Sequence, residues 1–230
     1  MAERTGLYPL KTINSESADL LISEVSERIK LGVESGEFPF SSESTFRFLF
    51  IWQLGIVLGF PSEHRFDFEW NAYEALDTED TFLDLLIYTD PSFKIALEFK
   101  LPKSSPSHKT NQTQTRAKIL LDISRLSYLV NNGINSIRLG YFLCATNEGP
   151  YIAEGRKSKG VQYKTYHGTV YPPGHVVPKD NGPNGIDREL PFPRHEIKFE
   201  WQEFEQKGVL SDRVTPRGRF AWLKPIKVFA

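Results

Sequence analysis

Three charged residues within one short apolar stretch have the types and spacing for metal-assisted hydrolysis. Residues 81–102 read TFLDLLIYTDPSFKIALEFKLP, and the Thr-Asp-Pro-Ser between two apolar runs predicts a β-hairpin. Asp84 lies in the first run, and Glu98 and Lys100 end the second. Burying two carboxylates and an ammonium is costly unless they bind something. Magnesium or manganese, which take oxygen ligands, would use these carboxylates.

Strand alternation places the three charged residues on one face of the hairpin. The odd-numbered positions of both runs are apolar, so they form the core face and the even-numbered positions form the other. A three-residue loop at 90–92 aligns the two core faces and puts Asp84 opposite Glu98, with Cβ atoms about 5 Å apart. Facing carboxylates repel each other, and a divalent cation would convert the repulsion into chelation. Lys100 follows one pleat along, within reach of a bound water or phosphate.

The hairpin resembles the PD-(D/E)XK nuclease superfamily, the fold of many type II restriction enzymes and repair nucleases. Asp84, Glu98 and Lys100 match the Asp, Glu and Lys of the superfamily motif. Leu83 replaces the Pro that often precedes the Asp. The resemblance covers roughly residues 40–146 and implies a restriction endonuclease-like core.

The resemblance implies a role for each of these groups. Asp84 and Glu98, with the main-chain carbonyl of Phe99, would bind the metal. Lys100 would orient or deprotonate the attacking water, or stabilise charge on the phosphate. An acidic residue of the preceding helix often joins such sites, and Glu43 lies in that helix. The alternatives are solvated carboxylates on an exposed strand, a Lys100–Glu98 ion pair, and a Glu43 that only complements its helix dipole.

Polar and basic residues after the hairpin are candidates for nucleic-acid contacts. In the resembled enzymes the helix after the hairpin often places polar side chains beside the scissile phosphate. The later segment 156–164, RKSKGVQYK, is a basic run suited to a phosphate backbone. A solvated helix start and a solvated surface loop are the alternatives. The candidate contacts are Gln112, Gln114, Arg116, Lys118, Arg156, Lys157 and Lys159.

The surrounding elements predict an α/β protein with a mixed sheet. Helices are expected at 14–29, from a Ser41 or Ser42 cap to 58, and at 113–130, and strands at 65–73, 136–145 and 219–229. The order is αβββαβ, which is also that of the resembled core. We expect residues 1–146 to contain an N-terminal helix and this core. Residues 147–230 would form a strand-rich, loop-rich extension that could contact the substrate, with strands near 163–171 and 196–201.

Composition and charge exclude several classes of protein. Residues 1–100 carry 8 Lys and Arg against 18 Asp and Glu, and residues 101–230 carry 20 against 11. The basic part could contact phosphates or simply neutralise the acidic part. The single Cys144 excludes an internal disulfide. The sequence shows no membrane-length apolar run, secretory signal, Gly-rich phosphate loop or nucleophile elbow, so we expect a cytoplasmic protein without a membrane partner.

These features predict a Mg2+- or Mn2+-dependent DNA endonuclease, of the type II restriction type, that uses metal-activated water. The restriction enzymes that the chain resembles usually act as dimers, because duplex cleavage needs two sites, so a homodimer is expected. The alternative is a nucleic-acid-binding or assembly protein that keeps the nuclease fold without catalysis. The target sequence, and the choice between DNA and RNA, stay open at this point.

Overall fold

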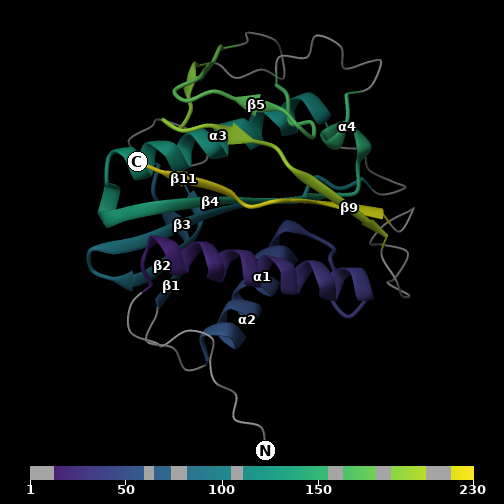
Figure 1. Ribbon diagram of the computed structural model, residues 1–230, viewed down its shortest axis with the longest axis horizontal. Coiled ribbons are helices and arrows are strands. Elements are labelled where there is room, and N and C mark those ends of the chain that lie inside the picture. The colour runs from purple at the N-terminus through teal and green to yellow at the C-terminus, as the bar shows by residue number, and fades with distance from the viewer. Residues whose placement is uncertain are drawn as a thin grey trace, which may run out of the picture.

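The computed structural model describes residues 13–59, 65–73, 82–104, 111–154, 163–179, 188–205 and 219–230. These residues form an α/β sandwich in which one sheet lies between two helical layers (Figure 1). Helices α1 (Ser15–Ser35) and α2 (Glu43–Leu58) cover one face, and α3 (Gln112–Asn131) covers the other. The expected α/β class with a mixed sheet is confirmed.

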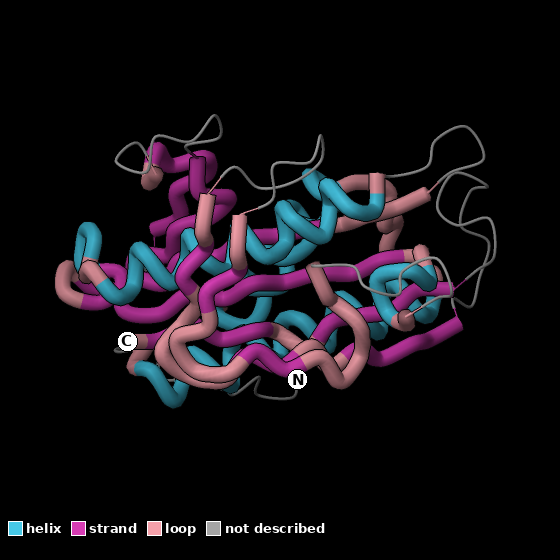
Figure 2. The backbone as a smooth tube through the Cα atoms, turned by 90° about the horizontal axis from the view of Figure 1, so that it is seen from above, coloured by secondary structure: helices cyan, strands magenta, loops and turns pink. Residues whose placement is uncertain are grey.

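Seven strands of the described residues form the central sheet, in the order β1-β2-β3-β4-β10-β9, with β11 also paired to β4. The β3–β4 pair is parallel, and the other pairings in this sheet are antiparallel. Helix α3 connects the parallel pair and packs along one face of the sheet (Figures 1 and 2). The strands are β1 (Arg65–Asn71), β2 (Phe82–Asp90), β3 (Phe93–Lys100), β4 (Ile137–Thr146), β9 (Trp201–Glu205), β10 (Arg219–Leu223) and β11 (Ile226–Phe229).

Short elements that follow β4 cover the outer side of α3. The Ser124 hydroxyl of α3 donates a 2.8 Å hydrogen bond to the carbonyl of Pro191, so this helix lies between the sheet and the later segment. Consequently α3 is buried on more than the one side that faces the sheet. These elements are α4 (Gly149–Ile152), the pair β5 (Val170–Tyr171) with β8 (Ile197–Lys198), and the pair β6 (Val176–Val177) with β7 (Leu190–Pro191). A short 3-10 helix, η2 (Ile134–Ser136), directly precedes β4.

Two hydrophobic cores, one on each face of the sheet, follow from strand alternation. Leu85 and Leu97 belong to the core formed with α1 and α2, as the odd-numbered pattern predicts. Leu86 and Ala96 are also fully buried, in the core formed with α3. The even-numbered face is therefore apolar in the middle of the hairpin and charged at the end that holds Glu98.

The hairpin has the predicted register but a shorter turn. Leu85 pairs with Leu97, as alternation requires. Strand β2 continues to Asp90, so two residues rather than three separate the strands, and a shift of register just before Asp90 absorbs the difference. The carboxylate of Asp90 accepts a 2.6 Å hydrogen bond from the N–H of Ser92 and closes the turn.

The other element boundaries agree with the predicted ones in part. Helix α2 follows a Ser42 cap, as predicted. Helix α1 runs six residues beyond the predicted end, to a left-handed Gly36 with φ 82°. The strand predicted at 219–229 is two strands, because Pro225 between them has no N–H for the ladder. The strands predicted near 163–171 and 196–201 correspond to the shorter β5 and β8. No helix of the described ranges is long and apolar enough to cross a membrane.

Candidate active site

Four carboxylates and one lysine converge at one end of the central strands. Glu43 opens α2, Asp84 lies near the start of β2, Glu98 and Lys100 end β3, and Asp122 lies in α3. Each of these charges acts on the pKa of at least one other member of the cluster. The structure thus brings together the four side chains predicted for catalysis, and it adds Asp122.

Lys100 pairs with acidic groups from both helical layers. Its Nζ atom lies 3.1 Å from Asp122 Oδ2 and 3.7 Å from Glu43 Oε1. Burial by itself would lower the pKa of Lys100, but the surrounding carboxylates, led by Asp122 and Glu43, outweigh it and raise the pKa. Lys100 is therefore a cation at neutral pH. This charge favours a role for Lys100 in charge stabilisation over a role in proton abstraction. Its ion-pair partners are Asp122 and Glu43, whereas the sequence suggested Glu98 as the alternative partner.

Glu98 is a buried carboxyl that tends to keep its proton. It is 2% exposed, and the Tyr73 hydroxyl donates a 2.8 Å hydrogen bond to its Oε1. Burial, together with the nearby charges of Asp122 and Asp84, raises the pKa of Glu98 well above its usual value. The Arg125 guanidinium lies 4.5 Å from the centre of the Tyr73 ring and closes this side of the cluster.

Asp84 takes the place of a main-chain partner where the β2–β3 ladder ends. Its Oδ2 accepts a 2.8 Å hydrogen bond from the N–H of Phe99, and its Oδ1 accepts a 3.2 Å bond from Arg47 Nη1. The observed pairing of β2 with β3 ends one position short of this, at Leu85 and Leu97, so the predicted pairing of Asp84 with Glu98 stays a prediction. The N–H and C=O of a strand residue point to the same neighbouring strand. The Phe99 carbonyl is therefore directed toward the β2 side, where a main-chain metal ligand is expected.

Arg47 connects Asp84 to the edge strand β1. Its Nη1 lies 3.2 Å from Asp84 and 3.6 Å from Glu69, whose side chain is 70% exposed. In the β1–β2 ladder the neighbours of Glu69 pair with the neighbours of Asp84. Glu69 therefore lies opposite Asp84. Its φ of 51° is uncommon for a residue other than glycine, and such backbone outliers gather at functional sites.

Sequence reasoning did not identify several residues of this cluster. Asp122 carried a readable signal, since it lies three residues after Ile119 and four before Leu126, on the apolar stripe of its helix. A carboxylate at that position must be buried near a partner. Arg47 and Tyr73 carried no such signal, because tertiary packing alone brings them to the site.

Arg116, predicted as a nucleic-acid contact, has a structural role in this fold. It is 2% exposed, and its Nη2 donates a 2.9 Å hydrogen bond to the carbonyl of Pro150. The guanidinium also lies over the rings of Tyr151 and Tyr166, 5.7 Å and 5.4 Å from their centres. The prediction used its position at the start of the helix, one turn after Gln112, but the segment after β4 covers this side of α3.

The other predicted contacts fall into two groups. Gln114 and Lys118 are exposed and Gln112 is half-buried at the start of α3, so they are accessible to a ligand. The basic run lies outside the described residues, and with it the predicted contacts Arg156, Lys157 and Lys159.

The donor chemistry of the cluster fits a magnesium ion that binds together with a phosphate. Within the described ranges, no three His, Cys, Asp or Glu side chains are grouped so that they could hold a metal ion. Magnesium, however, is usually held by one or two carboxylates plus substrate phosphates and water. Asp84 and Glu98 supply such a pair of oxygen donors in neighbouring strands. Arg47 would have to yield one oxygen of Asp84 to the ion.

The function of this chain has to be inferred from the geometry of the cluster and its surroundings. No protein-family model matches the sequence, and no curated protein is significantly similar to it. The resemblance to nucleases therefore depends on the hairpin residues and their neighbours.

Proposed function

We propose that this protein is a Mg2+- or Mn2+-dependent nuclease that hydrolyses phosphodiester bonds of DNA, on a core similar to that of restriction endonucleases. The observation that carries the proposal is the convergence of four carboxylates from α2, β2, β3 and α3 around Lys100. The order of elements, with a hairpin followed by a helix and a parallel strand, also agrees with the resembled core.

The raised pKa of Glu98 supports a cation-binding role for the cluster. This raised pKa arises from burial and from the negative charges of Asp122 and Asp84. Four carboxylates lie near Lys100, and their mutual charges disfavour the ionised form of Glu98. A divalent cation shared by Glu98 and Asp84 would offset that repulsion and favour the ionised form of Glu98.

Each side chain has a role in phosphodiester hydrolysis. Asp84 and Glu98, with the Phe99 carbonyl, would hold the metal, which when bound supplies a Lewis acid and an activated water. Lys100 stabilises the negative charge that grows on the phosphate. Glu43 and Asp122 are positioning residues that hold the Lys100 ammonium.

Cleavage assays on supercoiled plasmid and on a single-stranded oligonucleotide, with purified protein and added magnesium or manganese, test the proposal. Asp84→Asn and Glu98→Gln keep side-chain size and remove charge, so each should lower the cleavage rate by about a hundredfold or more. Glu27→Gln is the matched control, because Glu27 is 52% exposed in α1 and pairs only with its helical neighbour Lys30 among the ion pairs found. Absence of metal-dependent cleavage by the wild type, or wild-type rates in both site variants, would refute the proposal.

A second candidate function, nucleic-acid binding without catalysis, is favoured by one observation. Arg47 already pairs with Asp84, and Lys100 already pairs with Asp122, so internal cations satisfy part of the cluster without a metal. Such a protein would bind DNA, and neither magnesium nor manganese would support cleavage at any concentration. The cleavage assays and a binding assay on the same preparation separate the two functions.

A further inference from the structure

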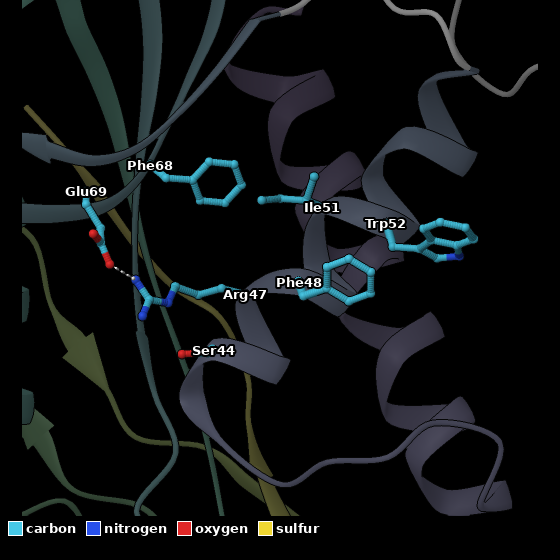
Figure 3. A pocket seen from close by; sticks show the side chains of 7 residues that line it. All are labelled: Ser44, Arg47, Phe48, Ile51, Trp52, Phe68 and Glu69. Atoms are coloured by element: carbon cyan, nitrogen blue, oxygen red, sulfur yellow. Dashed lines mark ion pairs between the residues drawn. The ribbon is translucent and has the colours of Figure 1, made fainter.

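A hydrophobic hollow of about 420 Å³ lies between α2 and β1, next to the carboxylate cluster (Figure 3). Arg47 lines the hollow and also donates a hydrogen bond to Asp84, so a single side chain separates the two sites. The main lining side chains are Arg47, Phe48, Ile51, Trp52, Phe68 and Glu69.

Three aromatic rings of this hollow are open to solvent. Phe48 is 62% exposed, Trp52 55% and Phe68 49%. Phe48 and Trp52 stack with ring centres 6.1 Å apart, and Phe68 reaches toward Ile51 from the opposite side (Figure 3). Soluble proteins rarely leave large apolar side chains gathered at one exposed place unless something binds there.

The chemistry of the hollow matches a nucleobase and its phosphate. Exposed aromatic rings offer flat surfaces for base stacking, and an arginine beside them offers a cation for the phosphate. Glu69 adds a carboxylate that can accept hydrogen bonds from the N–H groups of a base. An alkyl chain or an apolar helix would make no use of the Arg47 and Glu69 charges at the end nearest the cluster.

We propose that this hollow binds an unpaired base of the substrate strand, so that the substrate is single-stranded or locally unpaired at the cleaved phosphate. The inference rests on the proposed nuclease function. In a duplex the bases stack on one another, and only an unstacked base can lay its face on a side-chain ring. With a base in the hollow, the attached phosphate lies near Arg47, and Arg47 can exchange its contact with Asp84 for that phosphate.

Binding measurements in calcium, which supports binding without cleavage in the enzymes that the hairpin resembles, test this inference. The probes are a short oligothymidine and an abasic oligonucleotide of the same length, which keeps the phosphates and lacks the bases. Phe48→Ala and Phe68→Ala should each weaken oligothymidine binding by about tenfold and leave abasic binding unchanged. Leu31→Ala, which removes a 53% exposed side chain of α1 outside the hollow, should change neither. Phe48→Leu keeps apolar bulk without the ring and should behave like Phe48→Ala.

The outcomes distinguish failure of the inference from failure of the proposed function. Wild-type affinity for oligothymidine in both Phe48 variants, in a protein that cleaves DNA, would overturn the base-binding role and leave the nuclease proposal intact. Ring-dependent binding of oligothymidine without cleavage in any metal would support the hollow and refute the nuclease. A wild-type dimer that Phe48→Ala converts to monomer in sedimentation would show that a second copy covers this face, and would also overturn the inference.

Discussion

Replacing Glu98 with Gln should separate the stability of this site from its activity. Glu98 is 2% exposed and accepts a hydrogen bond from the Tyr73 hydroxyl, 2.8 Å away. Glutamine has nearly the same shape and keeps an oxygen for Tyr73, so packing and this hydrogen bond are preserved. The substitution therefore changes the charge of one buried group and little else.

The sign of the stability change follows from the raised pKa of Glu98. Burial and the charges of Asp122 and Asp84 raise this pKa well above the model-peptide value of 4.5, so the folded protein keeps a proton that the unfolded chain releases. At pH values between the pKa of Glu98 in the unfolded chain and its pKa in the folded protein, the free energy of unfolding falls as pH rises. The fall is up to about 1.4 kcal/mol per pH unit for one proton. Glu98→Gln does not titrate. Its stability relative to the wild type should therefore increase with pH over that range and be constant below it.

Urea unfolding of both proteins in a metal-free buffer, at several pH values from 4 to 8, measures this difference. Glu27→Gln, at an exposed position of α1, should show no such growth with pH relative to the wild type. A stability difference between Glu98→Gln and the wild type that stays constant with pH would refute the raised pKa. Cleavage by Glu98→Gln at the wild-type rate in magnesium would refute the ligand role, whatever the stability result.

Three further outcomes test the site and the packing around it. Magnesium or manganese at a hundredfold excess over Kd should add about 2.7 kcal/mol to the free energy of unfolding of the wild type and nothing to that of a variant without both proposed carboxylate ligands, and identical wild-type melting curves with and without metal would contradict this. Lys100→Met leaves buried carboxylates without their cation and should cost about 3–5 kcal/mol in urea unfolding, part of which a second change, Asp122→Asn, should restore. Gly140→Ala places a Cβ 3.1 Å from Leu126 Cβ and should cost about 1–3 kcal/mol, whereas Gly149→Ala meets no atom within 4 Å and should lower the melting temperature less.

Local patterns were enough to predict the hairpin and the charged residues that it carries. Alternation fixes which residues share a face, so the pairing of Leu85 with Leu97 could be read from the sequence. Glu43 could be placed because a serine cap marks the start of its helix. These signals act over a few residues, and tertiary packing did not override them.

Long-range packing determined the features that sequence reasoning missed. Arg116 was expected to contact nucleic acid from the start of its helix, but residues after β4 cover that face and bury the guanidinium. Arg47 lies on a helix that is apolar on most sides, and nothing in its own segment indicates that it reaches Asp84 across the sheet. Glu43 and the hairpin residues of the cluster, including its lysine, were predicted, whereas Asp122 and Arg47 were not.

The arrangement of β4 has a consequence for how this chain reaches its native state. Strand β3 covers one edge of β4, but the other edge pairs with β10 and β11, which follow much later in the sequence, as in the pairing of Tyr141 with Lys227. During refolding, β4 therefore presents an open, apolar edge until these distant strands arrive, and contacts between such distant segments form slowly. Open strand edges also pair between molecules. Refolding yield should consequently fall as protein concentration rises, and brief dilution should recover it.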